Sequence, residues 1–331
     1  MTEPPDRRTP TCAISIDLDA IGCYYRIHGL GAPPAELDHV ILERALPRAA
    51  KLFAARGVRV TWFVVGRDAD AELAGITPRD RQLRAKHAER LAALAAAGDE
   101  LGNHSYSHPY ELARLGAPET FAELADCDRV LRRITSAPVR GFRAPGYDVS
   151  PVMLDGLARL GYRYDSSVFP APGYYAAKAA VMAALRIAGR PSGAVLTDPR
   201  ALVAPAMPYR PAMNAPWRRG QAPVVELPIA VTPWLRLPAI GTSLIVLPAV
   251  VRRWIVDAMA GRALWNFELH GIDFADAELD GIPGELVARQ PDLRVPIAEK
   301  LDRLDRLLDQ IASRWTFETL GEVAARAQRE Q

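Results

Sequence analysis

Cys12-Ala-Ile-Ser-Ile-Asp17-Leu18 is an apolar run that ends in a carboxylate, and a second carboxylate, Asp19, follows it directly. A short apolar run of this kind is typical of a buried strand in a parallel sheet. Similar runs recur along the whole chain, separated by amphipathic segments of helical length. Strand-like and helical segments that alternate in this way predict an α/β architecture with a parallel sheet.

The alternation can be written out segment by segment. The predicted strands are residues 12–18, 58–65, 99–103, 141–144, 162–166, 224–229, 264–269 and 315–319, and the predicted helices are 36–56, 79–97, 118–135, 151–160, 174–187, 248–260 and 296–314. Pro47 should kink the first helix because it lacks a backbone N–H. No capped helix is apparent before Glu36, so Gly22 and the tyrosines at 24 and 25 are expected in a loop. Seven or eight β–α units favour a (β/α) barrel, complete or distorted, over an open sheet.

Composition limits the class of protein. The chain has 331 residues, 49% of them hydrophobic, and a formal net charge of +2. We expect one domain over residues 1–331, with an irregular proline-rich insertion at about 191–238 that carries ten prolines. Such an insertion either shapes the substrate pocket or packs on the outside. No dense block of Lys and Arg occurs, which argues against a nucleic-acid partner.

The compartment is also predicted from the sequence. The first ten residues are polar and resemble no secretory signal. Cys12, Cys23 and Cys127 are odd in number and form no Cys-x-x-Cys pair, as expected of reduced thiols. No apolar stretch is long enough to be a transmembrane segment. The sequence therefore predicts a soluble, cytoplasmic protein.

His104-Ser-Tyr-Ser-His108 places two of the six histidines four residues apart, just before Pro109. Two imidazoles at this spacing can reach one metal ion, although two surface histidines could also coincide by chance. The pair follows the third predicted strand, where a turn would present it to solvent.

Polar residues follow other predicted strands in the same way. Arg143, Asp165 and His270 each come directly after or at the end of an apolar run, as Asp17 does. Taken singly, each has a structural explanation: a long arginine can snorkel, an aspartate can cap a turn, and a histidine can be a satisfied core residue. Because active sites of (β/α) barrels lie at the carboxyl ends of the strands, their order indicates a catalytic site. One carboxylate with two histidines leaves positions open on a metal, as a hydrolytic site requires.

The order and wording of these motifs resemble the polysaccharide deacetylase superfamily, the nodulation-protein-B homology domain of carbohydrate esterase family 4. The resemblance covers residues 12–320 and rests on Asp17-x-Asp19, His104-Ser-x-x-His108, Arg143-x-Pro145-x-Tyr147, Tyr164-Asp-Ser166 and Leu269-His270. It implies a distorted, seven-stranded, TIM-like (β/α) barrel. It also implies a hydrolase of carbon–nitrogen bonds other than peptide bonds, which removes an N-acetyl or N-formyl group from an aminosugar or its conjugate.

The same resemblance implies a role for each motif. A divalent metal, with zinc the favoured ion, would be held by Asp19, His104 and His108. Asp17 would be the general base and Arg143 would pair with it. His270 would protonate the leaving amine, oriented by Asp165. A backbone N–H near Gly146 or Tyr147 would help to hold the oxyanion.

The chain departs from the commonest pattern of the family. Leu18 separates the two aspartates that are adjacent in the best-known members, so the base and the ligand could be exchanged. Asp165-Ser-Ser replaces an Asp-Trp motif. These features resemble branches that act on small or lipid-linked amides. Two alternatives stay open: hydrolysis of a non-sugar amide or ureide, as in allantoinase-like members, and a non-catalytic carbohydrate-binding barrel.

Two predicted helices carry much apolar surface. Residues 248–260 place apolar side chains on one stripe, and residues 176–188 are apolar almost all round. Core packing is the usual explanation for such a stripe. A peripheral contact with a membrane that carries a lipid-linked sugar is the alternative.

Overall fold

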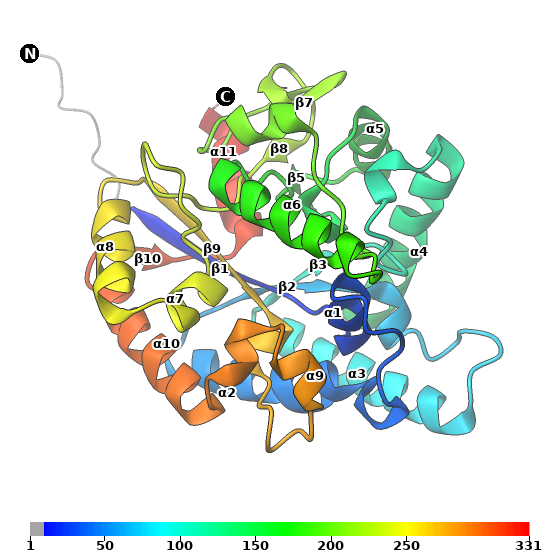
Figure 1. Cartoon of the computed structure of the whole chain (residues 1–331). Coiled ribbons are helices and arrows are strands. Elements are labelled where there is room, and N and C mark those ends of the chain that lie inside the picture. The colour runs from blue at the N-terminus through cyan, green and yellow to red at the C-terminus, as the bar shows by residue number, and fades with distance from the viewer. Residues whose placement is uncertain (1–9, 331) are drawn as a thin grey trace, which may run out of the picture.

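The computed structural model describes residues 10–330, and its centre is a curled sheet of parallel strands (Figure 1). Seven strands run in the order β9-β1-β2-β3-β4-β5-β8, and the short β10 pairs with the start of β1. The strands are β1 (Thr11–Asp17), β2 (Thr61–Val64), β3 (Glu100–Asn103), β4 (Gly141–Phe142), β5 (Tyr164–Asp165), β8 (Val225–Glu226), β9 (Leu264–His270) and β10 (Thr316–Phe317). The polar N-terminal segment used to predict the compartment lies almost entirely outside the described residues.

The two edges of the sheet approach each other. The Ala230 N–H, just beyond β8, donates to the Asn266 carbonyl in β9 at 3.2 Å. The side chain of Asn266 donates to the carbonyls of Leu227 and Pro228 at 2.8 and 3.2 Å. These bonds join β9 to the chain that follows β8. The sheet is therefore a distorted (β/α) barrel, as predicted.

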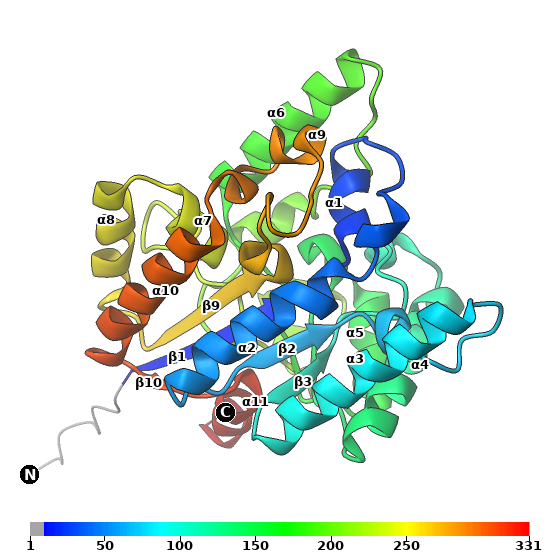
Figure 2. The same cartoon turned by 90° about the horizontal axis from the view of Figure 1, so that it is seen from below.

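Helices surround the sheet (Figures 1 and 2). They are α1 (Ile21–Ile27), α2 (Leu46–Ala55), α3 (Pro78–Ala96), α4 (Ala117–Thr135), α5 (Pro151–Leu160), α6 (Pro172–Ile187), α7 (Gly241–Val246), α8 (Ala249–Met259), α9 (Gly284–Val287), α10 (Ile297–Ala312) and α11 (Leu320–Glu330). Each predicted strand and helix overlaps an observed one. The predicted helix 36–56 is divided, because a π-helical turn over Ile41–Ala45 leads into α2, and Pro47 lies in the first turn of α2, where its missing N–H costs no helical hydrogen bond.

The expectation of a loop at residues 22–25 was wrong, because this segment lies in α1. Ala20 precedes the first turn of the helix and makes no side-chain capping bond, so the usual sequence signal for a helix start is absent. Four of its seven side chains are buried, namely Ile21, Cys23, Tyr24 and Tyr25. Packing against the barrel, and not a local signal, therefore stabilises this helix.

The proline-rich stretch is more ordered than expected. It contains a short hairpin of β6 (Pro211–Ala212) and β7 (Ala215–Arg219), and β8 completes the barrel sheet. Before it, α6 extends along the outside of the barrel and projects beside α1 (Figure 2). Within residues 10–330, no helix combines the length and the hydropathy that a membrane span requires.

Candidate metal and catalytic site

Parallel pairing brings the predicted site residues to one edge of the barrel. Asp17 ends β1 and is in register with His270, the last residue of β9, and with Phe63 of β2. His104 follows β3, and Arg143 follows β4. Because all these strands are parallel, their carboxyl ends meet at the same edge. The fold therefore assembles Asp17, Asp19, His104, His108, Arg143 and His270 in one place.

Asp19, His104 and His108 form a compact group of metal-ligand type. Oδ1 of Asp19 lies 3.0 Å from Nε2 of His104 and 3.3 Å from Nε2 of His108. All three side chains are buried, and their ligand atoms lie within 4.8 Å of one another. Although burial raises it, the imidazoles of His108 and His104 hold the pKa of Asp19 well below its usual range.

The donor atoms fit a divalent cation. Nδ1 of His104 donates to the Arg143 carbonyl at 2.7 Å, which directs Nε2 of the ring toward the Asp19 carboxylate, 3.0 Å away. Nε2 of His108 is buried and has no hydrogen-bond partner among the described residues. Two imidazoles and one carboxylate suit zinc and leave a position open.

The loop that carries the two histidines is strained and held by hydrogen bonds. Ser105 and His108 have φ values of 62° and 57°, a region that non-glycine residues rarely adopt. Oδ1 of Asn103 accepts from the Ser105 N–H at 2.8 Å, and Oγ of Ser105 accepts from the His108 N–H at 3.1 Å. The carboxylate of Glu123 accepts from two further N–H groups in the loop, at 2.9 and 2.8 Å. These bonds offset the strain and fix both imidazoles.

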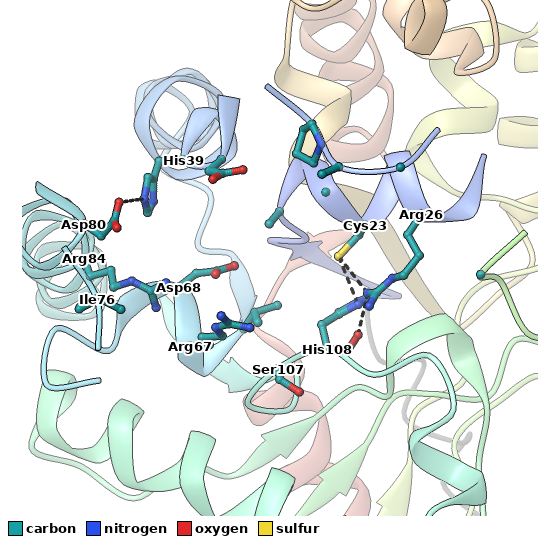
Figure 3. Close-up of a pocket in the computed structure, with 18 of the residues that line it drawn as sticks. Cys23, Arg26, His39, Arg67, Asp68, Ile76, Asp80, Arg84, Ser107 and His108 are labelled. Carbon is teal, nitrogen blue, oxygen red and sulfur yellow. Dashed lines mark hydrogen bonds and ion pairs between the residues drawn. The ribbon is translucent and has the colours of Figure 1, made fainter. Parts of the chain in front are cut away.

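α1 supports His108 from the side opposite Asp19. Sγ of Cys23 lies 3.4 Å from Nδ1 of His108, and the Arg26 guanidinium donates to the His108 carbonyl at 3.1 Å (Figure 3). Beyond these residues lies a larger open cavity of about 1050 Å³, which Asp68 and Arg84 also line. Sequence reasoning missed Cys23 as a support of the site because it placed the residue in a loop.

Asp17 and Arg143 form a buried ion pair. Nη1 of Arg143 donates to Oδ1 of Asp17 at 2.7 Å, and the guanidinium also donates to the carbonyl and the hydroxyl of Ser166 at 2.9 and 2.8 Å. The guanidinium stacks over the Phe63 ring, 4.3 Å from its centroid. Burial raises the pKa of Asp17, while the charge of Arg143 opposes this rise. The predicted pairing is present, and its donors fix the direction of the carboxylate.

His270 is held by Glu268 and Tyr147. Nδ1 of His270 lies 2.9 Å from Oε1 of Glu268, and Nε2 lies 2.8 Å from the Tyr147 hydroxyl. The Tyr147 hydroxyl donates to Oε1 of Glu268 at 2.9 Å, so it accepts from the protonated Nε2 of His270. Although burial lowers it, the Glu268 carboxylate raises the pKa of His270 well above its usual range. The ring is therefore a cation that can release a proton.

Asp165 does not orient His270. It accepts from the Ser167 hydroxyl, and its carboxyl group neighbours that of Glu226, whose Oε1 accepts from the Val168 N–H at 2.9 Å. Burial raises the pKa of Asp165 to about 6. The two acids form a separate carboxyl pair beneath the site. The Tyr147 N–H, considered near the oxyanion position, already donates to the Ala144 carbonyl at 3.1 Å.

The groups at the strand ends open into a pocket of about 290 Å³. We call Asp17, Asp19, His104, His108, Arg143, Glu268 and His270 the strand-end cluster. α6 contributes Tyr174, Lys178, Val181 and Met182 to the lining, which we call the α6 wall. From the proline-rich stretch, only Ser192 and Ala194 line this pocket. The proline-rich segment, which was expected either to shape the pocket or to pack on the outside, thus contributes little to the lining, and α6 contributes more.

Residues 38–164 match the family model described as polysaccharide deacetylase. A peptidoglycan deacetylase from Helicobacter pylori (strain ATCC 700392 / 26695) is 24% identical over 158 residues, which cover 47% of this chain and 48% of the relative. The match thus spans about half the length of this curated relative. The family-model match, residues 38–164, includes His104, His108 and Arg143.

Solved structures share the fold over nearly the whole chain. A putative polysaccharide deacetylase from Mycobacterium smegmatis has a TM-score of 0.58 at 16% identity, covering 99% of this chain and 94% of that chain. A PuuE allantoinase has a TM-score of 0.54 at 14% identity, covering 97% and 91%. At these identities the likeness concerns the fold alone. Over residues 38–164 the chain is thus similar in sequence to polysaccharide deacetylases, and over nearly its whole length it shares the fold of these solved structures.

Proposed function

We propose that this protein is a metal-dependent amidohydrolase that removes an N-acetyl or N-formyl group from an aminosugar or its conjugate. One observation carries the proposal: Asp19 and His104 of the three-residue ligand set, the paired carboxylate of Asp17 and the imidazole of His270 line the same 290 Å³ pocket. The family match supports the reaction class.

Each side chain has a chemical task in this proposal. Asp19, His104 and His108 would hold the ion, and when bound the ion would supply Lewis acidity toward water and the amide carbonyl. Asp17 takes the proton from the attacking water, and its raised pKa makes it a stronger base than an ordinary carboxylate. Arg143 keeps this carboxylate aimed. His270 gives its Nε2 proton to the nitrogen of the leaving amine, and Glu268 stabilises the cationic ring before transfer.

Three alternative functions differ in the ligand or substrate that the protein would bind. The non-catalytic binding barrel is disfavoured because the groups required for catalysis are all present and oriented. A non-sugar amide or ureide would use the same chemistry, and only the pocket would select it. A lipid-linked sugar would bring the protein to a membrane, where the exposed Val181 and Ile187 of α6 (53% and 89% exposed) would contact lipid.

A substrate screen tests the function. Purified protein, loaded with zinc, would be incubated with N-acetyl and N-formyl aminosugars, their nucleotide and lipid-phosphate conjugates, and simple cyclic ureides. Release of acetate or formate from the sugars supports the proposal, whereas hydrolysis of ureides alone contradicts it. Flotation with anionic liposomes at low salt tests the membrane contact: protein that stays in the unbound fraction and acts equally on a water-soluble conjugate removes the lipid-linked substrate.

A further inference from the structure

α6 places one charged side chain in the catalytic pocket. Lys178 lines the same 290 Å³ space as Asp17, Asp19 and His270, although it lies on a helix outside the barrel. None of the predicted catalytic or metal-binding roles uses it. Its position therefore calls for a separate explanation.

The ammonium group of Lys178 has no hydrogen bond and no ion pair with any described residue. Its nearest aromatic neighbours are the rings of Tyr174 and Tyr175, whose centroids lie 6.0 and 5.7 Å from Nζ. Contacts at this distance replace only part of the lost hydration of a cation. Burial accordingly lowers the pKa of Lys178 to about 8.

The carboxylate that acts on Lys178 most strongly is already engaged elsewhere. Asp148 accepts from the Thr197 hydroxyl at 3.0 Å and from the Asp198 N–H at 3.2 Å, and the Arg114 guanidinium lies 3.6 Å from it. Its charge is thus largely compensated before Lys178 is considered. A half-buried ammonium without a counterion is costly, and an anion brought in by a ligand would remove that cost.

A second polar group of the pocket is also without a partner. Tyr24 of α1 is 5% exposed, lines the same pocket, and its hydroxyl makes no hydrogen bond with any described residue. A buried hydroxyl of this kind usually has a partner. Together, Tyr24 and Lys178 present donors to the pocket from two helices that lie outside the barrel strands. The pocket is therefore suited to a ligand rich in oxygen acceptors.

The volume limits the size of that ligand. A space of about 290 Å³ lies at the lower end of the range for ligand pockets, which is about 300–1,000 Å³. The α6 wall encloses the strand-end cluster on one side, with Met182 and Val181 beside Lys178. One sugar unit with a small charged substituent suits this space better than a long polymer.

We propose that Lys178 forms an anion subsite, so that the substrate is a compact aminosugar amide bearing a phosphate or a carboxylate. This inference rests on the proposed amide hydrolysis and names the substrate class of the same site. Lys178 acts in binding, because it pairs with a part of the substrate that does not react. Tyr24 donates to an oxygen of the same substrate.

Kinetics with matched substrates test the subsite. The substrates would be neutral N-acetylglucosamine, its 1-phosphate and 6-phosphate, and N-acetylmuramic acid, which carries a carboxylate. We expect wild-type protein to prefer at least one anionic substrate, and Lys178→Gln to raise its KM about tenfold with little change in kcat. Lys178→Arg should keep the preference. Arg186→Gln, on an exposed position of the same helix, is the matched control and should change nothing.

A preference for a sugar phosphate indicates that the subsite binds phosphate, and a preference for N-acetylmuramic acid indicates that it binds a carboxylate. The subsite is rejected if Lys178→Gln affects neutral and anionic substrates equally, or if wild-type protein shows no preference for an anion. Calorimetric binding of the corresponding free amines, such as glucosamine 1-phosphate and muramic acid, separates this result from the reaction itself. Binding that depends on Lys178 without any hydrolysis supports the subsite and contradicts the proposed function. Hydrolysis without a preference for anionic substrates supports the proposed function and contradicts the subsite. If neither hydrolysis nor Lys178-dependent binding is found, both proposals are rejected.

Discussion

The strand-end cluster and the α6 wall differ in how many of their polar groups have hydrogen-bond or ion-pair partners. In the cluster, the charged side chains contact one another: Arg143 makes three hydrogen bonds, one of them to Asp17, and His270 contacts Glu268 and Tyr147. On the wall, Lys178 has no polar partner among the described residues, and Val181 is half exposed. The barrel therefore preorganises the chemistry, while the wall leaves groups free for a substrate. The two regions should respond differently to substitution.

Removal of a metal ligand should have the largest effect. His104→Ala should lose the bound ion and lower kcat/KM by about 10³-fold or more, since Lewis acidity contributes several kcal/mol. Elemental analysis and kinetics measure both quantities. His39→Ala is the control, because His39 pairs with Asp80 outside the cluster, 3.6 Å away. A metal-free wild-type protein with full activity would contradict the proposed mechanism.

Substitution of the two aspartates should separate their roles. We expect Asp17→Asn to keep the ion and lower kcat by about 10²-fold, because it removes the general base. Asp19→Asn should instead lose much of the ion, since its carboxylate faces both histidines. Metal content and kcat would be measured on both variants. If Asp17→Asn loses the ion and Asp19→Asn keeps it, then Asp17 is the metal ligand and Asp19 is the general base.

A smaller effect is expected at Glu268. The acid form of His270 is the active one, so activity is lost as pH rises through its pKa, which Glu268 raises. Glu268→Gln should lower that pKa, move the alkaline limb of the pH–rate profile to lower pH, and reduce kcat about tenfold at pH 8. Asp165→Asn is the matched control and should leave the limb in place. If the alkaline limb of the pH–rate profile moves in Asp165→Asn and not in Glu268→Gln, then Asp165 orients His270, as the sequence predicted.

The smallest effect concerns stability and leaves the cluster intact. Burial raises the pKa of Asp165 from 3.8 to about 6, and that of Glu226 rises as well. Raised folded pKa values stabilise the fold below the ordinary carboxyl pKa, and this contribution is lost as pH rises through the folded values. Urea unfolding of wild type should therefore show a decline between pH 4 and 7, and Glu226→Gln should make it shallower by about 1–2 kcal/mol. If stability declines with pH equally in Glu226→Gln and in wild type, the pKa of Glu226 is not raised in the folded protein.

The sequence was informative where residue type and position coincide. Polar residues after apolar runs identified Asp17, His104 and His270, because parallel strands end at one edge and the barrel fixes their order. Glu268 was missed as the partner of His270, although alternate residues of a strand face the same side and this spacing could have revealed it. Tyr24 and Cys23 were missed because α1 lacks a capping signal. Asp165 was misassigned, because proximity in motif order does not determine which carboxyl meets which imidazole.

The full pairing of β1 with β9 has a consequence for motion. Seven consecutive residue pairs join these strands, from Thr11 with Leu264 to Asp17 with His270. The backbones of Asp17 and His270 are therefore separated by the strand spacing of about 4.8 Å and belong to one rigid unit of the sheet. Their approach depends on the sheet and not on the closure of a loop. The α6 wall, by contrast, lines the pocket from outside the sheet, so a movement of α6 would change the access to the pocket without separating Asp17 from His270.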